Sequence, residues 1–193
     1  MNMRIATAAF VVIGALSIGA QEPRNVPVEH FSAGSPAMTS AARLTLRPVE
    51  IAITQWSTHT EHRALASALI EQGPLAFARL LCNYGAAGFI SVTGAPDVVI
   101  RYAWSIKEPD GNRRIYLATD RPVPLSSGWL RRFQDEEALT FVELRVNPDG
   151  SGEGKLSDAA RLSVDGIRQV IELTGYDGRP AHLFMVHTWG PVE

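Results

Sequence analysis

The segment NPDGSGEGKLSD, residues 147–158, has the residue types of a ligand-binding loop. Its oxygen-bearing side chains fall at the first, third, fifth and twelfth positions of a calcium loop: Asn147, Asp149, Ser151 and Asp158. An aspartate at the twelfth position is shorter than the bidentate glutamate that usually closes such a loop, and no helical pattern flanks it. A phosphate loop is excluded, because Gly154 and Lys155 are followed by leucine instead of serine or threonine. We therefore predict a hairpin turn, with a weak calcium contact as the alternative.

Residues that could support a metal site or nucleophilic catalysis are few and scattered. His59 and His62 stand three residues apart with Glu61 between them, but no third ligand is visible, so we predict a solvated helix start. Cys82 is the only cysteine, which excludes an intramolecular disulfide and a cysteine-based zinc site. The chain also has no Gly-x-Ser-x-Gly sequence. The sequence thus predicts no catalytic residue, no metal ligand and no cofactor.

Charged side chains on the polar side of the predicted strands form the remaining candidate binding site. Three stand at outward strand positions, and two lie where the segment RRIYLATD ends: Arg101, Glu143, Arg145, Asp120 and Arg121. We predict that they form cross-strand ion pairs, which keep an exposed sheet face soluble. The alternative is a polar surface that binds a small molecule or a protein under the irregular connection 121–138.

Two helices are predicted before residue 85. The segment STHTEHRALASALIEQGPLAFARLLCNYG begins with Thr58 and Glu61, which fit a capping box. Gly73 followed by Pro74 ends one helix and begins the next. We expect these two helices to pack on the strands that follow and so to position their side chains.

The rest of the chain predicts strands joined by tight turns. Residues 98–107, VVIRYAWSIK, alternate so that one face is expected to be buried and the other wet or half covered. Asp-Gly pairs at 110, 149, 165 and 177 favour tight hairpins, and Gly152 and Gly154 predict a bulged or closely approached strand. We predict an α+β fold, with a helical hairpin packed on one face of an antiparallel, meander-like sheet of about seven or eight strands.

The amino-terminal residues have the layout of an export signal. Residues 1–20 carry Arg4 and then an apolar run that is too short for a membrane span, which is typical of a cleaved signal peptide. Cleavage would leave 17 basic and 20 acidic residues and no stable membrane anchor, a charge that argues against a nucleic-acid partner. We expect residues 21–43 to be a disordered tail and residues 44–193 to form a single domain.

Several segments together resemble a family of small secreted bacterial proteins that have no assigned activity. They are QWSTHTEHRALASAL, VIRYAWSI, DGNRRIYLATDRP, FVELRVNPDGSGEGKLSDA and IELTGY, and the resemblance covers roughly residues 49–176. The chain departs from the family pattern at EEALTFVEL, where the family has an aromatic-proline-aromatic run, and at LLCNYG, where it has a Leu-Pro step. The resemblance implies a single exported domain and assigns no site residues.

Two functions are compatible with these observations. The first is an exported, periplasmic or secreted protein that binds an unknown small molecule or protein without catalysis, since no catalytic set of residues is visible. The alternative is a small hydrolase with a site under the connection 121–138, in which Asp120 acts with a histidine from elsewhere in the chain.

Overall fold

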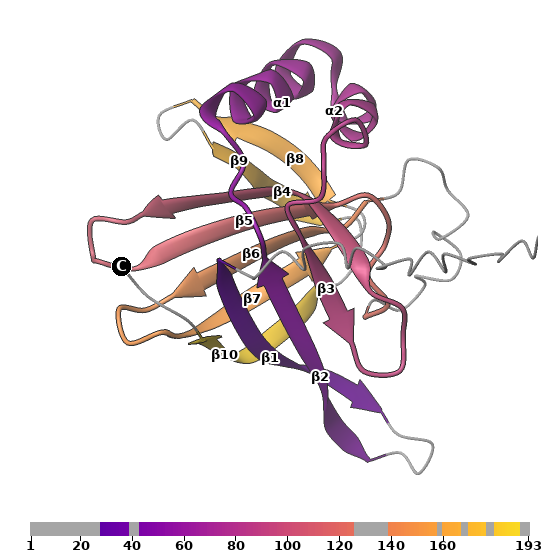
Figure 1. The fold of residues 1–193 in the computed structure, drawn as a ribbon, viewed down its shortest axis with the longest axis vertical. Coiled ribbons are helices and arrows are strands. Elements are labelled where there is room, and N and C mark those ends of the chain that lie inside the picture. Colours follow the sequence, from indigo (N-terminus) through magenta and orange to yellow (C-terminus); the bar gives the residue numbers. More distant parts are fainter. Residues whose placement is uncertain are drawn as a thin grey trace, which may run out of the picture.

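The protein folds as a closed β-barrel with additional elements packed on one side (Figure 1). The computed structural model describes residues 28–38, 43–125, 139–157, 160–166, 170–176 and 180–189. Within these ranges, no helix is long and apolar enough to cross a membrane.

Eight antiparallel strands close the barrel in the order β1-β10-β7-β6-β5-β4-β3-β2. Their bounds are β1 Glu29–Met38, β2 Leu44–Ile53, β3 Gly88–Val92, β4 Val98–Lys107, β5 Arg113–Thr119, β6 Phe141–Val146, β7 Ser151–Ser157 and β10 Ala181–Trp189. The chain runs up and down around the ring, and among the described residues it leaves the ring after β2 and after β7. Helices α1 (His59–Gln72) and α2 (Pro74–Leu81) follow β2, and the two-stranded sheet of β8 (Ala160–Asp165) and β9 (Val170–Tyr176) follows β7.

The predicted α+β class is therefore wrong. Strands dominate at 53%, and the sheet closes on itself instead of lying open beneath a helical hairpin. The antiparallel pairing of the sheet and the absence of a disulfide agree with expectation, as do the capping box at Thr58 and the helix end at Gly73. In a closed ring every strand has a hydrogen-bonded neighbour on both sides, whereas an open sheet leaves the outer edges of its two edge strands unpaired.

Closure depends on β1, which lies in the segment expected to be a disordered tail. Residues 29–38 pair with β2 on one side and β10 on the other. That expectation is contradicted over this range, and the folded body begins before residue 44. The local sequence, with Gly34 and Pro36, favours strand weakly. Pairing along both edges supplies the partners that hold it extended.

Apolar side chains from all eight strands fill the barrel interior. They include Phe31, Ile51, Ile90, Ile100, Leu117, Leu144, Leu156 and Leu183. Leu144 packs closely against Gly154, as expected for a glycine within a strand. A β-carbon at residue 154 would lie 2.6 Å from Leu144 Cδ2. Val123, from the segment after β5, is buried in the same cluster, and Arg47 donates to the Pro124 carbonyl at 3.0 Å.

A second core lies outside the barrel, between β4–β6 and the covering elements α1, α2, β8 and β9 (Figure 1). Tyr102, Tyr116 and Phe141 contribute the barrel side of this core. The single alternation expected along residues 98–107 is broken, because the register of β4 shifts between Ile100 and Tyr102. Ile100 points into the barrel, whereas Tyr102 points into the second core.

Candidate ligand site at the turn end of the barrel

Arg101, Asp120 and Arg121, three of the predicted site residues, form one ion-paired group. Arg101 donates to Asp120 Oδ2 through Nε at 2.9 Å and Nη2 at 2.8 Å, and through Nη1 to the Tyr84 carbonyl at 3.1 Å. Arg121 Nε lies 3.3 Å from the other oxygen of Asp120. Both carboxylate oxygens of Asp120 are thus engaged by arginines, which does not favour the proposed partnership with a histidine.

The other two predicted residues belong to a separate group on the outer face of β5 and β6. Arg114 bridges Glu108 at 2.7 Å and Glu143 at 3.3 Å, and Arg145 Nη2 lies 2.8 Å from Asp110 Oδ2. The five residues therefore form two ion-paired groups instead of one continuous surface. The covering connection expected at 121–138 lies outside the described residues from 126 onward.

A pocket of about 460 Å³ lies at the end of the barrel that carries the β4–β5 and β6–β7 turns, at the left of Figure 1. We call it the mouth pocket. Its lining residues are Ser105, Lys107, Gly111, Arg113, Val146, Asn147, Pro148, Gly150 and Thr188. None of the five residues predicted from the sequence lines it. Arg145 instead lines a second pocket, of about 390 Å³, with Met185 and Glu153.

Two turns of the same sequence pattern frame the mouth pocket. Pro-Asp-Gly occupies 109–111 in one and 148–150 in the other. In each, the glycine amide donates to a carbonyl three residues earlier at 3.0 Å, and the glycine has a positive φ, 87° at Gly111 and 81° at Gly150. These are the hairpin turns that the Asp-Gly pairs predicted. Asp165 ends β8, and the pair at 177 lies outside the described residues.

The aspartates of these turns bond to their own turns. The backbone amide of Asn112 is the main cause of the lowered pKa of Asp110. The side chain and then the backbone amide of Ser151 lower the pKa of Asp149, with hydrogen bonds of 2.6 and 2.9 Å. Asn147 Nδ2 also donates to Ser151 Oγ at 3.0 Å. Three of the four predicted calcium ligands therefore bond to one another, and the fourth, Asp158, lies outside the described residues.

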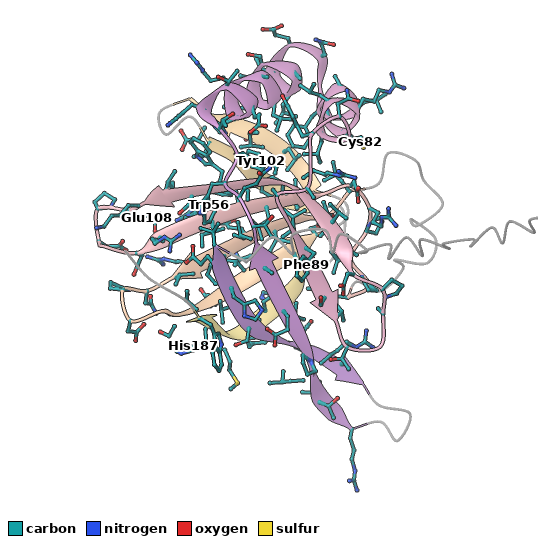
Figure 2. All side chains as sticks on the ribbon, viewed as in Figure 1. Trp56, Cys82, Phe89, Tyr102, Glu108 and His187 are labelled. Atoms are coloured by element: carbon teal, nitrogen blue, oxygen red, sulfur yellow. The ribbon has the colours of Figure 1, made fainter. Side chains whose placement is uncertain are left out.

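An ion pair joins opposite sides of the barrel beside the mouth pocket. Arg113 donates to Glu29 through Nη1 at 2.6 Å and through Nη2 at 2.9 Å. Glu29 begins β1 and Arg113 begins β5, four places around a ring of eight strands. The guanidinium also lies 5.9 Å from the centre of the Trp56 ring, which Figure 2 labels. Arg113 is therefore held in place by contacts from several parts of the fold.

Lys107, the last residue of β4, differs from Arg113 in having no charged partner. Within the described part of the chain, no carboxylate lies within ion-pair distance of its ammonium group. Alternation along β4 after its register shift places Lys107 and Ser105 on the side that faces the pocket. One feature of the sequence sets Lys107 apart, since it is one of only two lysines in the chain. Its orientation could not be predicted without the register shift.

Of the two histidines at the start of α1, His59 is exposed and His62 is a packing residue. His62 is buried, stacks on Trp104 with 4.2 Å between ring centres, and forms a 2.7 Å hydrogen bond between Nδ1 and the Tyr102 hydroxyl. Burial raises the pKa of Tyr102. His59 meets the edge of Trp104 at 5.0 Å. The expectation of a solvated helix start is wrong for His62, because the second core covers it. Among the described residues, no group of three or more potential metal ligands is present.

Comparisons with protein-family models, with curated proteins and with solved structures found no match.

Proposed function

We propose that this chain is an exported, non-catalytic protein that binds a small molecule in the mouth pocket. The observation that carries the proposal is the pocket itself, whose volume of about 460 Å³ is in the range of ligand sites in proteins. Strand ends and hydrogen-bonded turns form its walls, so the site is largely pre-formed. Apolar side chains fill the barrel interior, and the mouth pocket lies at its turn end.

The polar groups of the pocket favour binding over catalysis. Arg113 donates to Ser105 Oγ through Nε at 3.4 Å and Nη2 at 3.3 Å, and Thr188 Oγ1 donates to the Gly150 carbonyl at 3.3 Å. A nucleophilic hydroxyl needs a base within hydrogen-bond reach, and the neighbours of these two hydroxyls are a cation and a carbonyl. Such hydroxyls orient a bound molecule by hydrogen bonds.

Export is supported by the pattern of residues 1–20. The direct test is the amino-terminal sequence of the protein recovered from outside the cytoplasm. A mature terminus near residue 20 or 21 supports export, and full-length protein found only in the cytoplasm refutes it.

Binding is tested by thermal unfolding with a library of small metabolites. A ligand present at 100 times its Kd stabilises the folded state by about 2.7 kcal/mol, which raises the Tm by several degrees. We expect such shifts in the wild type and in Lys155→Met, which alters the chain's other lysine on the outer side of β7. They should be lost in Lys107→Met. Shifts that persist in Lys107→Met would show that Lys107 does not hold the ligand, and a library without a single hit would contradict small-molecule binding.

A further inference from the structure

The charges around the mouth pocket define what kind of molecule it can hold. Arg113 and Glu29 form a two-pronged pair in which both terminal nitrogens of the guanidinium are occupied. The pair is neutral as a unit and offers no free fork to a ligand. Lys107 is left as the cation without a counter-charge among the described pocket residues.

Other groups in the pocket complement an anion beside Lys107. Ser105 Oγ accepts hydrogen bonds from Arg113, so its own hydrogen is directed away from the arginine and is free to donate. Val146 and Pro148 contribute apolar surface to the lining of the pocket. A molecule with one anionic group and a compact apolar body would match all three features.

We infer that the mouth pocket selects a small monocarboxylate, held by Lys107, and that Glu29 sets this selectivity by neutralising Arg113. The inference rests on the proposed function and adds the ligand class. A doubly charged anion such as a phosphate monoester meets only one uncompensated cation in the wild-type pocket, so its second charge is desolvated without a partner. Without the Glu29 carboxylate, Arg113 would become the second cation.

Three matched probes separate the charge of the ligand from its shape: benzoate, benzamide and phenyl phosphate. Reductive methylation with ¹³C-formaldehyde labels the amino groups and keeps their positive charge, and the chain has only two lysines, Lys107 and Lys155. Each lysine signal is assigned with its own Lys→Met variant. We expect benzoate to shift the Lys107 signal saturably, the Lys155 signal to stay in place, and benzamide to bind at least about fivefold more weakly. Phenyl phosphate should bind no more tightly than benzoate.

Glu29→Gln tests the role of the ion pair while keeping the shape of the side chain. In this variant we expect the affinity for phenyl phosphate to rise about tenfold relative to benzoate, because Arg113 becomes available to the anion. Circular dichroism and the melting temperature show whether the variant is folded. If it is not, Lys107→Glu provides the second test, since it alters an exposed strand end and should abolish benzoate binding.

The outcomes separate this inference from the proposed function. Equal affinities for benzoate and benzamide would overturn the anion class while small-molecule binding stands. Tighter binding of phenyl phosphate than benzoate by the wild type, or an unchanged ratio in folded Glu29→Gln, would overturn the selectivity by Glu29. If neither the probes nor any library compound moves the Lys107 signal, both the ligand class and the proposed function fail.

Discussion

Replacing Glu29 with alanine is expected to lower the free energy of unfolding by about 2–3 kcal/mol. The carboxylate accepts two charge-assisted hydrogen bonds from Arg113, at 2.6 and 2.9 Å, and only 9% of its side chain is exposed. The substitution leaves the guanidinium without its counter-charge and removes the link between β1 and the opposite side of the barrel.

The magnitude follows from the burial of the two partners. Removing one partner of a fully buried ion pair costs about 3–5 kcal/mol, mainly because the other charge is left uncompensated. The Arg113 side chain is 28% exposed, so water solvates part of the freed guanidinium and the cost falls below that range. In a double-mutant cycle with Arg113→Ala, we expect a coupling energy of about 1.5–2.5 kcal/mol, within the range for charged groups in direct contact. The cycle also removes the separate contact of Arg113 with Trp56 from the comparison.

A second glutamate on the neighbouring strand provides the matched control. Glu50 lies 3.1 Å from His30 Nε2, with the two side chains 45% and 38% exposed. Exposed pairs contribute about 0–1 kcal/mol, so Glu50→Ala should cost less than about 1 kcal/mol. Urea unfolding at neutral pH measures all variants, provided that the m-values agree.

Two results would refute this reasoning. If Glu29→Ala and Glu50→Ala lower the stability equally, burial of the Glu29–Arg113 pair does not contribute as argued. If the cycle gives a coupling energy below about 0.5 kcal/mol, the two side chains do not interact in solution as they do in the structure.

Three further predictions concern the two cores and the turns. Gly154→Ala should lower the free energy of unfolding in urea by about 1–3 kcal/mol, because its β-carbon would meet a leucine methyl group in the barrel interior. Gly85→Ala, which has open space around it, should lower it by less. Equal losses of stability in the two variants would contradict this account. Tyr102→Phe should cost about 1–2 kcal/mol, because it leaves the buried His62 without its hydroxyl partner, and an unchanged melting curve would show that the bond contributes nothing. The pKa of Asp149 is lowered in the folded protein, so its contribution to stability is complete above the ordinary value of 3.8 and is lost as the pH falls through the lower folded value. The stability difference between the wild type and Asp149→Asn should therefore shrink over that acid range, and a difference that grows there would show the wrong sign.

Features set by neighbouring residues could be predicted from the sequence. The capping box at Thr58, the helix boundary at Gly73 and the turns at Gly111 and Gly150 all depend on a few consecutive residues. Alternation also indicated most of the strands. Closure of the ring could not be predicted in this way, because it depends on β1 pairing with two strands at once and not on its own weak strand pattern.

The candidate site was missed for a related reason. Arg101 and Arg145 face outward, as their positions suggested, and carboxylates beside the strands engage them: Asp120, directly after β5, and Asp110, in the β4–β5 turn. Lys107 faces the pocket because the β4 register shifts near Ile100, which reverses the inward and outward positions beyond it. One register shift reverses the inward or outward assignment of every residue beyond it. The sequence of residues 98–107 does not mark where the shift occurs.

The position of the ligand site follows from how the barrel is filled and covered. The interior is occupied by apolar side chains, and one outer side, over β4–β6, is covered by the second core. The turn end is different because its inward-facing positions include the charged residues Glu29, Arg113 and Lys107. Two of these charges are 84 residues apart in the chain and neutralise each other only because the ring is closed. The third has no such partner, so closure of the barrel both fixes the arginine and leaves one lysine available to an anionic ligand.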